Sequence, residues 1–195
     1  SAPFYPGDIK LSTAPFFYID VEVSNVGKST AEGSILVALE GIFAGNDRKG
    51  RGELYRRDRL VGCRFKSAAA ADETEVLATD RDGISYAIGD HQKKLYADFA
   101  AAGELRNTIF PLSTKCFSCG ALSWKFKLPA NGVKKKVFIL AGYFPAAALN
   151  IKGTGSSFLY TKYFKNVDEV LSYARSERNQ IQKRSDFFEH TLAAS

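Results

Sequence analysis

Residues 121–144 read ALSWKFKLPANGVKKKVFILAGYF, and they contain two strands of different character. In the first, Leu122, Trp124 and Phe126 alternate with Ser123 and Lys125, which is the period of a strand with one buried face. The loop Pro-Ala-Asn-Gly at 129–132 then reverses the chain. The second strand, 133–144, is apolar on both faces after its opening lysines, a pattern typical of a central strand covered on both sides.

The same period-two alternation predicts further strands, at 16–24, 35–39, 60–66, 75–79, 84–88 and 158–163. Turn residues at 25–28 should join the first two of these as an antiparallel pair, and an Asp-Gly step at 82–83 is a hairpin signal. A polar, Gly-rich stretch at 44–53 indicates a loop. Eight or more strands with turns between them predict a mainly β protein, a large antiparallel two-sheet β-sandwich of the supersandwich type.

The last segment changes period and predicts one long α-helix at the C-terminus. Asn166 followed by Glu169 is a plausible N-cap with its capping partner. Apolar positions then recur at spacings of four and three, and we take six of them as candidates for an interface with another domain: Val167, Leu171, Ala174, Ile181, Phe188 and Leu192. A helix over 167–192 would be a rod of roughly 39 Å, longer than a cap on a sandwich needs.

Composition limits the class of protein. The chain has 195 residues, 45% of them apolar, which suits one large or two small globular domains and excludes a disordered chain. No segment reaches the roughly 20 apolar residues of a transmembrane helix, and the first residues lack the features of a signal peptide. The sequence contains no Met, so we expect a piece of a longer protein. Three cysteines leave the compartment open, with a soluble, cytoplasmic location favoured.

Few residues suggest chemistry. Asp20 and Glu22 lie on one strand face roughly 6.6 Å apart, near the spacing of paired carboxylates in inverting glycosidases, but every polar strand face offers such pairs. Cys116 and Cys119 have the CxxC spacing of a metal or redox site, yet the second half of a zinc site is missing. With only two histidines there is no nucleophilic triad. We therefore predict no catalytic residue, no metal site and no cofactor.

Basic residues crowd between Arg48 and Arg59, around Tyr55. Such a mixture could bind nucleic acid, but Asp47, Glu53 and Asp58 partly neutralise it and the net charge of the whole chain is only +6. A solvated loop, or one docked on an acidic partner, is the favoured interpretation, and nucleic acid is an unfavoured partner.

Several stretches resemble, in order, the N-terminal domain of glucosylceramidase-type glycoside hydrolases of family 116. The opening PGDIKLSTAPFFYIDVEVSNVGKST, from Pro6, resembles that family's Pro-x-Asp and Leu-Ser-x-x-Pro stretch followed by a strand ending in an Asn-x-Gly turn. LYADFAAAGEL at 95–105 resembles its aromatic-x-Asp-Phe and Gly-x-Leu segment. The strand-turn-strand at 121–145 and LYTKYFKNVDEVLSYA at 159–174 resemble its aromatic-Pro corner and its N-capped linker helix.

The resemblance implies a β-sandwich domain over 1–165 and a linker helix over 166–195 that leads towards an absent catalytic (α/α)6 barrel. In such enzymes the catalytic carboxylates lie on the barrel, so this chain alone should be inactive. Its expected partners are its own downstream catalytic domain and, in the full enzyme, a carbohydrate or glycolipid substrate. A second copy of the chain, dimerising through the C-terminal helix, is another expected partner. The alternatives are a free-standing carbohydrate-binding or adhesion sandwich and, third, a nucleic-acid binder.

Overall fold

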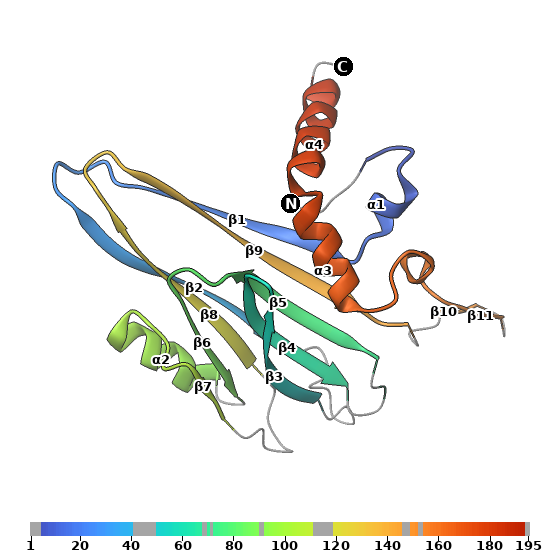
Figure 1. Cartoon of the computed structure of the whole chain (residues 1–195), viewed down its shortest axis with the longest axis horizontal. Helices are drawn as coiled ribbons and strands as arrows, with labels where there is room; N and C mark the ends of the chain where they lie inside the picture. Colours follow the sequence, from blue (N-terminus) through green and yellow to red (C-terminus); the bar gives the residue numbers. More distant parts are fainter. Residues whose placement is uncertain are drawn as a thin grey trace.

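The structure, a computed structural model, describes residues 5–40, 50–67, 70, 72–89, 92–110, 119–145, 149–151 and 154–193. Most of its strands form two sheets that pack face to face (Figure 1). The first sheet has the order β1 (Phe16–Ser24), β9 (Val133–Tyr143), β5 (Thr74–Asp80), β4 (Leu60–Ser67), β3 (Gly50–Arg57). The second has the order β2 (Ala31–Glu40), β8 (Cys119–Leu128), β6 (Ile84–Gly89), β7 (Thr108–Ile109). Only β6 and β7 pair in parallel among these strands, so the predicted antiparallel sandwich is confirmed.

Helices cover both outer faces of the sandwich. The remaining elements are α1 (Ile9–Thr13), α2 (Gln92–Ala102), β10 (Leu149–Ile151), β11 (Thr154–Ser156), the 3-10 helix η1 (Leu159–Lys162), α3 (Val167–Ser176) and α4 (Arg178–Ala193). α3 lies on the first sheet and α2 on the second, which gives four layers (Figure 1). Among the helices in the described ranges, none is both long enough and apolar enough to cross a membrane.

Three apolar clusters fill the spaces between these layers. The cluster between the sheets includes Phe65 and Phe138 from the first sheet and Leu122 and Trp124 from the second. A second cluster lies between the first sheet and α1, η1 and α3, and a third between the second sheet and α2. The four-layer arrangement explains why β9 is apolar on both faces: Phe138 points into the sandwich, while Ile139 points towards α3.

The turns do reverse the chain, but they join strands of different sheets. The predicted hairpin at Asp82-Gly83 is wrong, since β5 before the turn belongs to the first sheet and β6 after it to the second. β1 and β2 are likewise not paired with each other, because β1 pairs with β9 and β2 pairs with β8. A turn motif predicts only that the chain reverses direction. The strand after the turn can pair in the same sheet or belong to the other sheet of the sandwich.

The predicted loop at 44–53 is partly wrong, because β3 begins at Gly50; residues 41–49 lie outside the described part of the chain. β3 pairs with β4 through a turn at Asp58, whose φ of 51° is in the left-handed region that Asp tolerates. Tyr55, 2% exposed, anchors the strand in the cluster beneath α3. The charged residues around Tyr55 suggest a solvated loop, but the burial of Tyr55 holds this segment in the sheet as a strand.

The strand predicted at 158–163 is also wrong, and the segment forms η1. Tyr160 and Phe164 are buried and four residues apart, a spacing that brings them to one side of a helical turn. The Tyr160 hydroxyl accepts a hydrogen bond from the Phe144 backbone N–H at 2.9 Å, which ties η1 to the end of β9. Aromatic residues are generally enriched in strands, but here the four-residue spacing of the buried Tyr160 and Phe164 matches a helical turn, and the segment is helical.

The predicted single C-terminal helix is interrupted at Glu177, where α3 ends and α4 begins. The Tyr18 hydroxyl donates to the Ala174 carbonyl oxygen at 2.6 Å. In a continuous helix that carbonyl would accept from the N–H of Arg178. A side chain inserted into the helical hydrogen-bond ladder is a recognised cause of a break, and we attribute the interruption to Tyr18.

Candidate functional site at the C-terminal helices

Four of the six predicted interface residues, three on α3 and Ile181 on α4, pack against the chain's own first sheet and not against another domain. Val167, Leu171, Ala174 and Ile181 are between 0% and 5% exposed and belong to the cluster beneath α3. They are therefore core residues of this domain in the structure. The prediction of an interface with another domain now rests on Phe188 and Leu192; Phe188 is half-buried, and the side chain of Leu192 lies outside the description.

α4 is held to the sandwich by Arg178, at its first residue. The Arg178 guanidinium forms an ion pair with Asp20 of β1 and lies 5.2 Å from the centre of the Tyr18 ring. Both partners belong to the same strand, so one side chain fixes the start of α4 against β1. Arg178 stands four residues after Ala174 and three before Ile181, in the spacing of the apolar positions, and this charge among them is the signal in the sequence for an acidic partner.

A second arginine holds α4 near its middle. The Arg184 guanidinium lies 2.7 Å from a carboxylate oxygen of Asp8 and 5.3 Å from the centre of the Tyr5 ring. The other oxygen of Asp8 accepts from the backbone N–H of Leu11, capping α1. Asp8 therefore links α1 to α4, a contact between the two ends of the chain that no local pattern predicts.

These two arginine contacts fix the direction of α4, which rises from the sandwich towards the C-terminus (Figure 1). Past Ile181 the helix continues for about three turns. Phe187 on this part is 66% exposed, the most exposed aromatic side chain among the described residues. α4 thus has a fixed base and an exposed outer half.

The paired carboxylates Asp20 and Glu22 line a groove of about 370 Å³ between β1, β9 and α4, together with three basic residues. Asp20 pairs with Arg178, and Glu22 lies 2.6 Å from the Lys135 ammonium. The two side chains are 43% and 57% exposed. A general acid needs an enclosed, weakly polar environment, and neither carboxylate has one.

Tyr18 makes the junction of α3 and α4 sensitive to alkaline pH. Burial raises the pKa of its phenol above the ordinary value of 10.0. The unfolded chain would lose the phenol proton of Tyr18 near pH 10, while the folded chain keeps it to higher pH. The contribution of this phenol to the free energy of unfolding is therefore complete below pH 10 and falls as the pH rises further.

We expect Tyr18→Phe to lower the free energy of unfolding by about 1 kcal/mol at neutral pH, because the hydrogen bond to Ala174 is lost. Above about pH 10 the difference between the free energies of unfolding of the two proteins should narrow, since only the natural chain has the phenol proton of Tyr18 to lose. Urea titrations followed by circular dichroism at several pH values measure both effects. If the free energies of unfolding of the two proteins fell equally with rising pH, this role of Tyr18 would be contradicted.

Comparison with known families gives a match that covers most of the chain. The family of the N-terminal domain of β-glucosidase 2, glycosyl hydrolase family 116, matches residues 1–181. The chain belongs to this family. A comparison with curated proteins finds no match. The family 116 match ends at Ile181, which among the described side chains of α4 is the last that is buried against the sandwich.

The basic stretch of this family 116 domain is only partly described, since Arg48 and Lys49 lie outside the described residues. Arg57 pairs with Asp168 of α3 at 2.8 Å, and Arg64 of β4 lies 4.5 Å from the centre of the Tyr55 ring. Tyr55 is buried and cannot stack on a base. The geometry thus assigns Arg57 and Tyr55 to the attachment of α3.

The cysteines of the family 116 domain that the structure describes are buried. Cys63 and Cys119 are free thiols, 0% and 1% exposed. Burial raises the pKa of both thiols, that of Cys119 to about 11, which opposes formation of the reactive thiolate. Cys116, the other half of the CxxC pair, lies outside the described residues. Within the described ranges no cluster of His, Cys, Asp and Glu could hold a metal ion.

Proposed function

We propose that this domain is a non-catalytic part of a glycoside hydrolase that packs on a downstream catalytic barrel and shapes one wall of its cleft. Membership of a glycosyl hydrolase N-terminal family supports the class of enzyme. The exposed ion pairs of Asp20 and Glu22 favour a structural role for these carboxylates.

The observation that carries the proposal is the outer half of α4. Ile181 is the last described side chain of α4 that is buried, the family match ends at the same residue, and beyond it Arg184 is the side chain that the structure ties to Asp8 and Tyr5. Residues 182–193 extend about 18 Å further, in a direction fixed by Arg178 and Arg184. We therefore place the start of the linker after Ile181, later than the position 166 that the sequence predicts, with Phe187 facing the barrel.

The experiment uses this chain and a family 116 catalytic barrel produced as a separate polypeptide. We expect the chain alone not to hydrolyse an aryl β-glucoside, and the two polypeptides to form a complex measurable by isothermal titration calorimetry. Phe187→Asp should weaken the complex at least about tenfold, because a charge would be buried in the interface. Ile109→Asp is the matched control, since Ile109 is also exposed but lies on β7 of the other sheet.

Two results would contradict the proposal. One is hydrolysis by the chain alone that disappears in Asp20→Asn or Glu22→Gln. The other is failure of the chain to bind the barrel together with saturable binding of glycans, which would favour the free-standing carbohydrate-binding alternative. Phe158 and Tyr163, 38% and 40% exposed, are the aromatic side chains beside η1 that such binding would use. Dimerisation through α4 would appear as a concentration-dependent mass that Phe187→Asp abolishes.

A further inference from the structure

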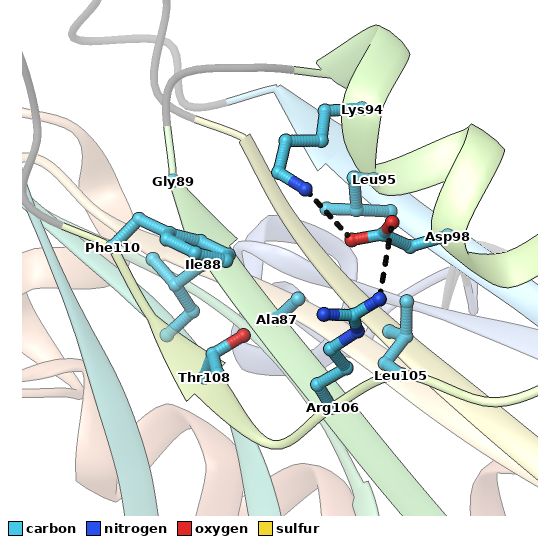
Figure 2. A pocket seen from close by; sticks show the side chains of 10 residues that line it. All are labelled: Ala87, Ile88, Gly89, Lys94, Leu95, Asp98, Leu105, Arg106, Thr108 and Phe110. Carbon is cyan, nitrogen blue, oxygen red and sulfur yellow. Dashed lines mark hydrogen bonds and ion pairs between the residues drawn. The ribbon is translucent and has the colours of Figure 1, made fainter.

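A pocket lies on the opposite side of the sandwich from α3, between α2 and the strands β6 and β7 (Figure 2). Its walls are formed mainly by five apolar side chains: Ala87, Ile88, Leu95, Leu105 and Phe110. The residue pattern predicts neither α2 nor β7, and the pocket that they form with β6 is therefore not expected from the sequence.

The walls of the pocket are fixed by hydrogen bonds to β6, one between backbone groups and two that each use a side chain. The Leu105 backbone N–H donates to the Ser85 hydroxyl at 2.8 Å, and the Asn107 side-chain oxygen accepts from the Tyr86 N–H at 3.0 Å. The Phe110 N–H donates to the Ile88 carbonyl at 2.8 Å. Three contacts thus hold the segment after α2 in place, so the pocket has fixed walls, as ligand sites usually do.

The size of the pocket limits what can enter it. Its volume is about 60 Å³. A cavity of roughly 150 Å³ accepts benzene, whereas a water-sized group needs about 10–15 Å³, so this pocket holds about four to six groups of that size. A branched aliphatic group such as an isobutyl group fits this space, and an aromatic ring does not.

Polar groups at the mouth of the pocket leave an excess of positive charge. Lys94 and Arg106 both approach the Asp98 carboxylate, at 3.4 and 3.9 Å, so two cations share one anion among the described side chains there (Figure 2). The Arg106 side chain is 73% exposed and its contact with Asp98 is long, which leaves most of its N–H donors free for a ligand. The Thr108 hydroxyl is a further donor at the edge of the pocket.

We propose that this pocket binds a small branched-chain aliphatic carboxylate. The branched end of the ligand lies against Ala87 and Leu105, and its carboxylate accepts hydrogen bonds from Arg106 and Thr108. Both halves of the ligand have a matching surface: the apolar walls exclude a purely polar anion, and the unbalanced cation at the mouth favours an anionic ligand over a neutral one.

The test is a titration of the isotope-labelled chain with 4-methylpentanoate, followed through the backbone amide signals of Gly89, Leu105 and Thr108. We expect saturable shifts with a dissociation constant of about 1 mM, a value ordinary for so small a ligand. 4-Methylpentanamide has the same shape without the charge and should bind about tenfold more weakly.

Two variants and one control locate the binding. Arg106→Gln should weaken binding of the carboxylate about tenfold and leave binding of the amide nearly unchanged. Lys93→Gln removes the same charge from an exposed position on α2 outside the pocket, and should change the affinity less than twofold. Ala87→Val fills the pocket and should abolish the shifts for both ligands, while the amide spectrum remains that of a folded protein.

Equal affinities for the carboxylate and the amide, or equal effects of Arg106→Gln and Lys93→Gln, would overturn the assignment of a carboxylate ligand. Unchanged binding by a folded Ala87→Val protein would overturn the location. An acetylated dipeptide ending in leucine carries the same two groups, and clearly tighter binding of this peptide would overturn the assignment to a free acid in favour of a chain terminus.

Discussion

Replacing Leu171 by alanine is expected to lower the free energy of unfolding by about 3 kcal/mol. Leu171 is 0% exposed and lies in the cluster between α3 and the first sheet. Removing a buried leucine side chain loses its transfer free energy and leaves a cavity, and such changes cost about 2 to 5 kcal/mol. Urea unfolding of the isolated chain measures the difference.

The matched control is Phe187→Ala on α4. Phe187 is 66% exposed, so its removal should change the free energy of unfolding by less than about 0.5 kcal/mol. The two variants separate a residue of the domain core from a candidate for the interface with a barrel. Should both variants have the same small effect, α3 would not be docked on the sheet in solution, and Leu171 would return to the set of interface candidates.

The layers of the fold can be predicted from the sequence because they follow from the alternation of apolar and polar residues within each strand. β1, β4 and β9 each bury one or both faces, and the period of their apolar residues records this directly. The pairing of the strands cannot be predicted in this way. A turn such as Asp82-Gly83 sets the direction of the chain, but whether the next strand continues the sheet or crosses to the other one depends on contacts far away in sequence.

The errors on β3 and η1 have the same physical origin. In β3 one buried residue, Tyr55, outweighs the exposed charges of its neighbours, and the residues that bury it include those of α3, more than a hundred positions later in the chain. In η1 the burial of Tyr160 and Phe164 depends on β9 and on α3. A pattern within ten residues does not contain these partners.

The features that matter for function depend even more on contacts between distant segments. The contact of Arg184 with Asp8 joins opposite ends of the chain, and the pocket beside α2 combines a helix, two strands and the segment between them. Residue types alone predict neither this ion pair nor this pocket. What the sequence does provide is the resemblance that assigns the family, because that resemblance depends on the order of several short segments and not on any single contact.

Replacing Asn25 by alanine is expected to destabilise the domain by about 3 kcal/mol, because several backbone groups would lose their partner together. The Asn25 side-chain amide donates to the carbonyl oxygens of Ser29, Leu128 and Pro129, at distances of 2.8, 3.2 and 2.9 Å. Its own oxygen accepts from the Gly27 N–H at 2.9 Å. One side chain, 9% exposed, thus joins the β1–β2 and β8–β9 connections, which lie together at one end of the sandwich (Figure 1).

Asn25→Asp has the same shape but replaces the donating amide by a carboxylate that faces three carbonyl oxygens, so it should destabilise the domain at least as strongly at neutral pH. Ser29→Ala is the control, since Ser29 contributes only its backbone carbonyl and its substitution should cost less than about 0.5 kcal/mol. Urea unfolding gives the free energies, and hydrogen exchange shows where the structure opens. We expect faster exchange first in the ends of β1, β2, β8 and β9 next to these connections. A stable Asn25→Ala protein with unchanged exchange there would mean that the two connections hold together without the amide.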